Sequence, residues 1–304
     1  MNPDMNKAVV CFGEVLWDIL PSGTVPGGAP ANVAYHLGKQ GIHAPVITRI
    51  GTDEQGAELR QLFDKKGVDT TWFQSDNTYG TGKVYARPLE NHDVDYDIVQ
   101  PVAWDYIAWE PGFEHLLENA AFLVYGSLAA RGTTSRNTLF QILEMRCQKA
   151  FDLNLRAGFY SRQLITQLIG KADFVKMNRS ELEWVTDWYT RLHTTEERLQ
   201  FFSDNFRIAN AVVTMGGEGA IFISDGQLTK QQELSIGVED TVGSGDAFLA
   251  GLLSKLIEGV SNKEALEFAN LLGAFIATKR GPCPDYHPND LRISDFIKHP
   301  KQTI

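Results

Sequence analysis

The stretch DTVGSGDAFLAG, residues 240–251, places three small residues between two acids and then continues as an apolar run with helical character. Small residues let a backbone approach an anion, and the first N–H groups of a helix lack intrahelical acceptors. The stretch is therefore either an anion pocket or an ordinary helix start in which Asp246 complements the helix dipole. The second interpretation leaves the glycines on both sides of Ser244 unexplained, because glycine destabilises a chain unless its backbone freedom is used. The residues alone leave both interpretations open.

Common phosphate and nucleophile motifs do not fit this stretch. No GxxxxGK[ST] sequence is present, so a Walker loop is excluded. A dinucleotide GxGxxG motif fails because Phe248 stands at its third glycine, and a GxSxG nucleophile elbow fails because Val242 stands at its first. The glycines therefore need another explanation.

Short apolar runs alternate with helical periodicity along most of the chain. The strand-like runs are 7–13, 44–51, 121–127, 150–155, 172–178 and 210–216, and the helical ones are 29–41, 53–67, 134–149, 243–258 and 262–280. This alternation predicts parallel strands packed between helices. Right-handed crossovers then bring the carboxyl ends of the strands to one edge, where ligands bind in open α/β sheets.

Residues 68–110 interrupt the alternation and contain no clear helix. KVYARPL and VDYDIV are typical of strands and are joined by ENHD. This pattern predicts an antiparallel insertion that serves either as a lid beside the ligand edge or as an ordinary edge hairpin. We therefore expect one domain, 1–304, with a small lid insertion around 68–110.

Composition narrows the classes of protein. The chain has 304 residues and a net charge of −10 without any Lys/Arg run, so no nucleic-acid partner is expected. It has no apolar run long enough to span a membrane, and MNPDMNKAVV lacks the pattern of a signal peptide. Three separated cysteines without CxxC spacing indicate a reducing compartment, and the seven histidines show no metal-ligand spacing. We expect a cytoplasmic protein with no membrane partner.

Two neighbouring segments in the first 40 residues carry groups that suit a polyhydroxy ligand. In GGAPANVA, Gly27 and Gly28 allow close approach of a ligand, and Asn32 can donate and accept hydrogen bonds to hydroxyls. In GEVLWD, the Asp18 carboxylate can accept two hydrogen bonds from a diol. The alternatives are a turn with Pro30 near a helix start and an aspartate in a turn at a strand end.

Three further segments follow predicted strands. In MNRSE, Asn178 and Glu181 are suited to orienting water around Mg²⁺, whereas Ser180 is a candidate helix N-cap. In DLNLR, Arg156 offers a planar fork for phosphate or is an ordinary surface arginine. TMGGEGA, residues 214–220, is either a glycine-rich hairpin or bare backbone beside a nucleotide.

Together and in this order, the segments resemble the ribokinase-like (PfkB) family of carbohydrate kinases, and its fructokinase branch most closely. The resemblance runs nearly end to end and is carried by GEVLWD (13–18), PGGAPANVAYHLGKQG (26–41), GTDEQG (51–56), YGS (125–127), DLNLR (152–156), NRSE (178–181), VTMGGEGA (213–220), DTVGSGD (240–246) and FANLLGAFIATKRG (268–281). It implies a ribokinase-like three-layer α/β/α fold with a central, mostly parallel sheet and a small β-sheet lid. It also implies an ATP-dependent kinase that transfers the γ-phosphoryl group to a sugar hydroxyl, with fructose as the expected sugar.

The resemblance implies roles for the matched residues. Asp246 matches the catalytic base, which also contacts the sugar, and the anion hole matches Gly243, Ser244 and Gly245. The expected sugar-binding residues are Asp18, Gly27, Gly28, Asn32 and Arg156. The expected nucleotide contacts are Asn178, Thr214, Gly216, Gly219, Gly243, Gly245 and Asn270. Asn178 and Glu181 are expected to organise Mg²⁺ through water, and Asp240 with the Val242 carbonyl to line a site for a monovalent cation such as K⁺.

The sequence departs from the family pattern in three places. Ser244 stands where many members carry alanine, and RGPCP at 280–284 replaces a commoner Gly-Ala sequence, which leaves the rest of the cation site open. The lid is the least matched part, so it leaves the choice of sugar open. The alternatives are a kinase for another sugar, a sugar acid or a nucleoside, and a non-catalytic sugar-binding sensor of the same fold. The expected partners are ATP, the sugar, and a second copy of the chain paired through the lid edge.

Overall fold

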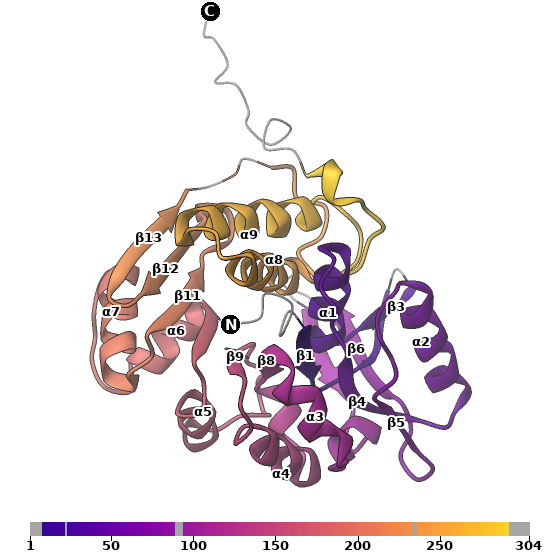
Figure 1. Cartoon of the computed structure of the whole chain (residues 1–304). Coiled ribbons are helices and arrows are strands. Elements are labelled where there is room, and N and C mark those ends of the chain that lie inside the picture. The colour runs from indigo at the N-terminus through magenta and orange to yellow at the C-terminus, as the bar shows by residue number, and fades with distance from the viewer. Residues whose placement is uncertain (1–7, 22, 89–93, 233, 235, 292–304) are drawn as a thin grey trace, which may run out of the picture. The chain divides into compact units, whose positions relative to one another are not determined.

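The computed structural model describes residues 8–21, 23–88, 94–232, 234 and 236–291 (Figure 1). The chain divides into two compact units. Unit 1 comprises Met1–Gly38 and Ile42–Ala172, and unit 2 comprises Lys39–Gly41 and Asp173–Ile304. A single domain spanning 1–304 stays a prediction.

The main sheet of unit 1 is parallel, with the strand order β9-β8-β1-β4-β5. Its strands are β1 (Ala8–Phe12), β4 (Val46–Gly51), β5 (Phe73–Asp76), β8 (Ala120–Gly126) and β9 (Gln148–Asp152). From β1 the chain proceeds to β4 and β5, and it then returns on the other side of β1 to form β8 and β9. The order therefore reverses between β1 and β8, which is the point where open α/β sheets bind ligands at the strand carboxyl ends.

The strands of this sheet are apolar because both of their faces are covered. Val9, Val10, Cys11 and Phe12 of β1 are all fully buried, as expected for a parallel strand between helical layers. The helices of unit 1 are α1 (Ala29–Lys39), α2 (Glu54–Lys65), α3 (Gly112–Glu118), α4 (Thr133–Ile142) and α5 (Arg162–Ile169), with 3₁₀ turns η1 (Ala103–Tyr106) and η2 (Leu128–Ala130). The predicted helix 134–149 is too long, because α4 ends at Ile142 and residues 148–149 already begin β9.

A second, four-stranded sheet in unit 1 forms the lid. Its strands are β2 (Leu16–Leu20), β3 (Gly23–Gly27), β6 (Gly82–Pro88) and β7 (Val94–Ile98), in the order β3-β2-β6-β7. β6 and β7 are antiparallel, as the pattern of 83–99 predicts, and the joining ENHD lies outside the described residues. β2 pairs with β3 antiparallel and with β6 parallel.

The lid sheet and the predicted insertion 68–110 differ in extent. β5 lies inside the predicted insertion but pairs with β4 of the main sheet. β2 and β3 lie outside it, in the segment where a turn at a strand end was one of the two interpretations of Asp18. The segment 16–27 carries four Gly and Pro residues, which weaken any strand pattern. Asp18 instead lies in the middle of β2, where it is opposite Val25 of β3 and Val84 of β6.

Unit 2 combines parallel and antiparallel strands. β10 (Phe174–Asn178) is parallel to β11 (Asn210–Thr214), and β12 (Ala220–Ser224) and β13 (Gln227–Gln231) extend the sheet antiparallel. The helices are α6 (Arg179–Thr186), α7 (Thr195–Phe206), α8 (Ser244–Glu258) and α9 (Asn262–Ala277), with 3₁₀ turns η3 (Gly216–Glu218) and η4 (Pro288–Asp290). TMGGEGA thus joins two antiparallel strands, as the hairpin interpretation predicts.

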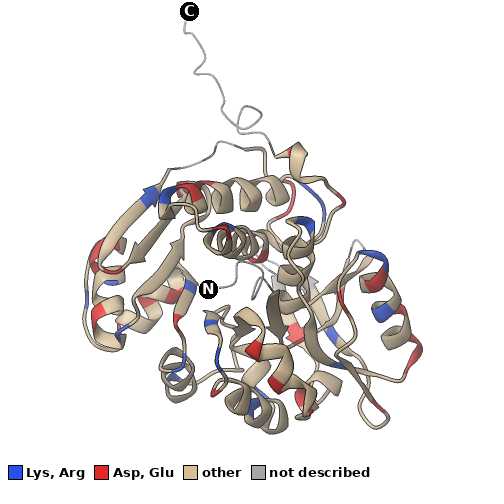
Figure 2. Ribbon diagram, viewed as in Figure 1, with Lys and Arg blue, Asp and Glu red and all other residues tan. Residues whose placement is uncertain are grey.

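Charged residues of both signs are interspersed along the ribbons of both units (Figure 2). None of the helices among the described residues combines the length and apolarity needed to cross a membrane. Cys11, Cys147 and Cys283 all lie in the described part of the chain, and none of them forms a disulfide there.

Candidate active site

The start of α8 carries the stretch DTVGSGD. Gly243 is the N-cap residue, and no side chain caps the helix. The backbone of Gly243 is left-handed, with φ 77°, and a Cβ there would lie 2.5 Å from the Cα of Pro282. Only glycine fits this position without strain. Because it has no side chain, the segment at Pro282 can come close to the helix start. The first turn combines backbone N–H groups with the carboxylate of Asp246. The Ser244 N–H already donates to the Thr241 carbonyl at 3.2 Å, and the anion hole at 243–245 stays a prediction.

Asp240 fixes the approach to this helix. Its Oδ1 accepts a hydrogen bond from the N–H of Val242 at 2.9 Å, and its Oδ2 accepts one from the N–H of Gly281 at 3.1 Å. The N–H groups of Glu239 and Asp240 both donate to the carbonyl of Ala277 at the end of α9. Asp240 thus joins the loop before α8 to the segment after α9. Its role as a ligand of a monovalent cation, with Val242, stays a prediction.

The start of α6 holds the predicted pair Asn178 and Glu181. Asn178 is the N-cap, and its Oδ1 accepts a hydrogen bond from the N–H of Glu181 at 2.9 Å. Glu181 Oε2 accepts one from the N–H of Asn178 at 2.8 Å, which completes a capping box. Ser180, the N-cap candidate from the sequence, lies inside the first turn instead. The capping box therefore holds the two predicted Mg²⁺ ligands, Asn178 and Glu181, next to each other.

β11, the strand next to β10, places Thr214 beside Asn178, and both residues are predicted nucleotide contacts. The parallel register pairs Asn178 with Thr214, the last residues of β10 and β11. After β11 the chain turns through Gly216 and Gly219, which have φ of 59° and 91°. A Cβ on Gly219 would lie 2.0 Å from the carbonyl oxygen of Gln231, so that position excludes any side chain. The structure brings Thr214, Gly216, Gly219 and Asn178 to one end of this parallel pair.

Lys176 is a residue that sequence analysis missed. It lies in the middle of β10, two residues before Asn178, so both side chains project from the same face of the strand. It is 7% exposed, and its Nζ lies 3.1 Å from the position that a Cβ on Gly245 would take. A buried ammonium group thus sits against the first turn of α8. The available signal was a lysine inside the otherwise apolar run FVKM, since lysine is rarely buried without a purpose.

Asn270, the remaining nucleotide candidate, lies on the buried side of α9. It is 9% exposed, and its Nδ2 donates a hydrogen bond to the carbonyl of Gln232 at 3.2 Å. This contact ties α9 to the chain that follows β13. Its assignment to the adenine or ribose of a nucleotide stays a prediction.

Four of the predicted sugar-binding residues form one group in unit 1. The carboxylate of Asp18 lies over Gly27, because a Cβ on Gly27 would come within 2.0 Å of Asp18 Oδ2. Gly28 has φ 112°, and a Cβ there would lie 2.3 Å from the carbonyl oxygen of Glu14. The N–H of Asn32 donates to the carbonyl of Gly28 at 3.0 Å, and Asn32 is 4% exposed. The two glycines therefore allow the strand with Asp18 and the helix with Asn32 to approach each other.

Arg156 is exposed, beyond the end of β9. Its Nη1 donates a hydrogen bond to the carbonyl of the preceding residue, Leu155, at 3.3 Å. This local contact does not fix the guanidinium beside Asp18 or Asn32, so a substrate role for Arg156 stays a prediction.

Among the described residues, no three His, Cys, Asp or Glu side chains converge as a ready metal cage. Mg²⁺ commonly binds through one or two carboxylates and retains several waters, so a cage is not required. Asn178 and Glu181 offer oxygen donors of that kind, and they fit a water-mediated ion. Asp240 and the Val242 carbonyl are also oxygen donors, which suits a hard monovalent cation.

The chain is similar to known carbohydrate kinases along most of its length. The profile of the pfkB family carbohydrate kinase matches residues 22–289. A curated relative, probable fructokinase-7 of Arabidopsis thaliana, is 27% identical over 312 residues, which cover 92% of this chain and 90% of that protein.

Solved structures show the same fold. Fructokinase from Vibrio cholerae O395, in its fructose, ADP and calcium ion bound form, is 24% identical with a TM-score of 0.82, covering 97% of this chain and 99% of that one. Aminoimidazole riboside kinase from Salmonella enterica is also 24% identical, with a TM-score of 0.77 and coverage of 95% and 99%. The predicted ribokinase-like α/β fold with a small second sheet is therefore confirmed.

The left-handed backbone at Gly243 generates a stability prediction. Gly243→Ala should lower the free energy of unfolding by about 1–3 kcal/mol, the usual range for a residue forced into a sparsely populated conformation. The control is Gly237→Ala in the same segment, where a Cβ would meet nothing within 4 Å. Urea unfolding of both variants measures the difference. Equal stability of the two variants would contradict the close approach at Pro282.

Proposed function

Because the chain belongs to the PfkB family of carbohydrate kinases, we propose that it transfers the γ-phosphoryl group of ATP to a hydroxyl of a free sugar. The observation that carries the proposal is the uncapped start of α8, with Asp246 in its first turn. We further propose that the sugar is fructose, which rests on the names of the relatives.

The first turn of α8 is assigned the binding of the phosphoryl group that is transferred. Phosphoryl transfer depends mainly on alignment and on stabilising charge that spreads over the transferred group. The predicted donors are the backbone N–H groups of Gly243, Ser244 and Gly245, and the helix dipole adds to them. Of the three, the Ser244 N–H already donates to the Thr241 carbonyl at 3.2 Å, so the proposal rests on Gly243 and Gly245. The ammonium group of Lys176 adds a full positive charge beside Gly245. This local charge offsets the net −10 of the chain, which otherwise repels a nucleotide.

Asp246 is assigned the role of the base that accepts the proton of the sugar hydroxyl. Its place in the first turn of α8 puts a carboxylate next to the donors that hold the transferred group. In a loose transition state the nucleophile loses its proton late, so a carboxylate is a sufficient base.

The sugar itself is assigned to Asp18 and Asn32. A carboxylate and a buried amide together accept and donate hydrogen bonds to neighbouring hydroxyls. Gly27 makes room for the Asp18 carboxylate and Gly28 makes room for the Glu14 carbonyl. Arg156 completes the proposed set. The lid sheet that carries Asp18 would exclude water, which competes with the sugar as the acceptor.

The proposal includes Mg²⁺ and a monovalent cation. Asn178 and Glu181 would hold Mg²⁺ through water, and Asp240 with the Val242 carbonyl would hold K⁺. When bound, Mg²⁺ neutralises negative charge on the phosphates. Thr214, Gly216, Gly219 and Asn270 are assigned to the nucleotide. The lid has edge strands β3 and β7, and we propose that a second copy of the chain pairs there.

A second candidate is a nucleoside acceptor instead of fructose. The same fold is found in the aminoimidazole riboside kinase of Salmonella enterica, so the fold does not choose between the two acceptors. A sugar-binding sensor without turnover is less well supported, since Asp246, Asn178 and Glu181 are all retained.

The direct test is ATP consumption in the presence of candidate acceptors. Purified protein with Mg-ATP should release ADP with fructose and should do so faster than with other ketoses, aldoses, sugar acids or nucleosides. A nucleoside as the best acceptor would replace fructose and keep the kinase. ATP turnover with none of the compounds, combined with measurable sugar binding, would favour the sensor instead.

Asp246→Asn should lower kcat by about 100-fold or more, the range for losing a general base, while the KM for ATP changes little. Asparagine has nearly the same shape, so the helix start stays intact. Glu258→Gln, at the other end of α8, serves as the matched control. A near-normal kcat for the asparagine variant would remove Asp246 from the role of base.

Lys176→Met should lower kcat/KM for ATP by roughly 10-fold to 100-fold, as expected for one lost hydrogen bond to a charged group. Methylammonium added to the assay should restore part of the loss, which a purely structural role would not allow. The control is Lys255→Met, in the last turn of α8 and paired with Glu258 at 2.7 Å. If the Lys176 variant kept unchanged steady-state kinetics, Lys176 would have no role in binding the phosphates of ATP.

A further inference from the structure

We propose that the first turn of α2, centred on Asp53, is the anchor that holds the sugar-facing strands β2 and β6, and that Asp53 is a positioning residue for sugar capture. The segment GTDEQG, residues 51–56, has no role assigned in the site above. The proposal rests on the proposed function, because it takes Asp18 of β2 as a sugar ligand.

A single carboxylate links the helix to the lid. Asp53 Oδ1 accepts hydrogen bonds from the N–H of Gly56 at 2.8 Å and from the Oγ1 of Thr81 at 2.6 Å. Asp53 Oδ2 accepts one from the N–H of Thr81 at 2.8 Å. Gly56 belongs to α2, whereas Thr81 is the residue directly before β6. Asp53 is therefore both the N-cap of α2 and the attachment point of a lid strand.

β2, the lid strand that carries Asp18, has its own link to the first turn of α2. The indole Nε1 of Trp17 donates a hydrogen bond to the carbonyl of Gln55 at 3.0 Å. Trp17 lies in β2 directly before Asp18, and it is 4% exposed. β2 and β6 also pair with each other, with Asp18 opposite Val84. β2, which carries Asp18, and the neighbouring β6 are thus both fixed to residues 53–56.

The glycines of GTDEQG make this junction possible. A Cβ on Gly51 would lie 2.6 Å from Asp53 Oδ2 and 2.7 Å from the Thr81 nitrogen. A Cβ on Gly56 would lie 2.1 Å from the Gly51 carbonyl oxygen and 2.7 Å from Thr81 Oγ1. The N–H of Gly51 also donates to Thr81 Oγ1 at 3.1 Å. Thr81, 2% exposed, therefore fills a socket formed by Gly51, Asp53 and Gly56.

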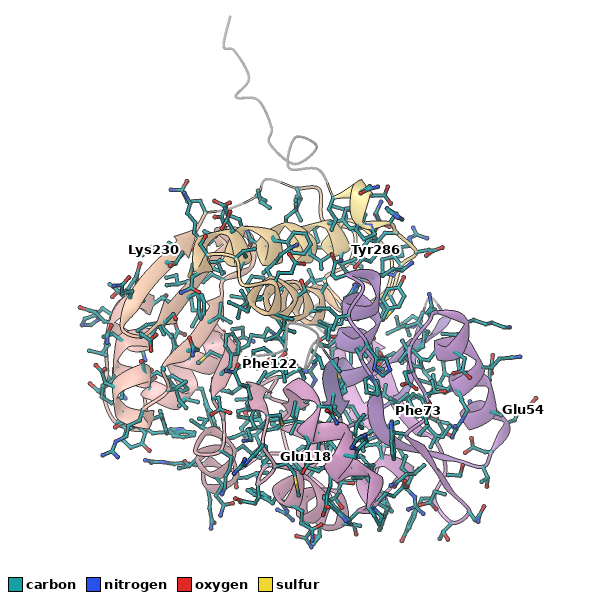
Figure 3. The ribbon with its side chains drawn as sticks, viewed as in Figure 1. Glu54, Phe73, Glu118, Phe122, Lys230 and Tyr286 are labelled. Carbon is teal, nitrogen blue, oxygen red and sulfur yellow. The ribbon has the colours of Figure 1, made fainter. Side chains whose placement is uncertain are left out.

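The anchor works as an ionised carboxylate. Burial acts to raise the pKa of Asp53, but hydrogen bonds from Thr81 and Gly56 outweigh it and hold the pKa below its ordinary value. Glu54, the next residue, extends away from the ribbon at the exposed side of α2 (Figure 3). The acid that faces the lid is therefore Asp53.

The test separates the lid link from the helix cap. Asn is as good an N-cap as Asp, so Asp53→Asn keeps the acceptor for Gly56 while placing an amide N–H₂ opposite the N–H of Thr81. Thr81→Val keeps the shape of Thr81 and the cap but removes the hydroxyl. We expect each variant to raise the KM for the sugar about 10-fold, to leave the KM for ATP within twofold, and to shift the melting midpoint by a few degrees at most. Thr81→Ser, which keeps the hydroxyl, should behave like wild type.

Asp204→Asn is the matched control, since Asp204 is an exposed carboxylate that accepts only from Gln200 on the same helix in the contacts described. Amide hydrogen exchange provides a readout that needs no catalysis. Exchange in β2 and β6 should rise at least 10-fold in Asp53→Asn, while exchange in α2 stays unchanged.

The outcomes are distinct. An active wild type whose Asp53→Asn and Thr81→Val variants keep the sugar KM, or raise both KM values equally, would overturn the positioning role. Unchanged exchange in β2 and β6 would overturn the anchor itself. A wild type that phosphorylates no acceptor would instead defeat the proposed function, and hydrogen exchange would still decide the anchor.

Discussion

The start of α8 has no capping side chain, and the proposed chemistry depends on that. A left-handed glycine opens the helix, and Pro282 occupies the space where any side chain would extend. The N–H groups at a helix start need acceptors from outside the helix. Ser244 donates to the Thr241 carbonyl, and an anion is the natural acceptor for the others. The buried ammonium of Lys176 strengthens the same field from a neighbouring strand. Charge that develops during phosphoryl transfer thus meets donors that are already oriented, so little reorganisation is needed when the reaction occurs.

The predicted sugar-binding residues of unit 1 also depend on glycines that leave room for a neighbouring group. Two of them, Asp18 in β2 and Asn32 in α1, lie in regular elements that follow β1 in the chain. Gly27 and Gly28 let the β2 and α1 segments approach closely enough for Asp18 and Asn32 to act together. A lid that carries a ligand residue also has to be held in register. The Asp53–Thr81 and Trp17–Gln55 contacts supply that restraint from the start of α2.

Much of this arrangement could be predicted from the sequence, and the exceptions share a cause. Helix α8 begins within a residue of its predicted start, because glycine and the apolar period mark it clearly. Asn178 and Glu181 could be paired by their spacing, although the choice between them and Ser180 as the cap needed backbone geometry. β2 and β3 could not be found, since glycine and proline obscure their alternation. Lys176 and the Thr81 socket depend on contacts between residues 25 to 69 positions apart, which no local pattern records.

Phosphorus NMR of the wild-type protein with Mg-ATP and fructose tests the central claim most directly. The account predicts that the γ-phosphorus resonance of ATP disappears while ADP and a sugar phosphate ester resonance grow in equal amounts. Formation of ADP with inorganic phosphate alone would show that water is the acceptor and would contradict a sugar kinase. Loss of ATP signal only when a nucleoside replaces fructose would contradict the choice of sugar.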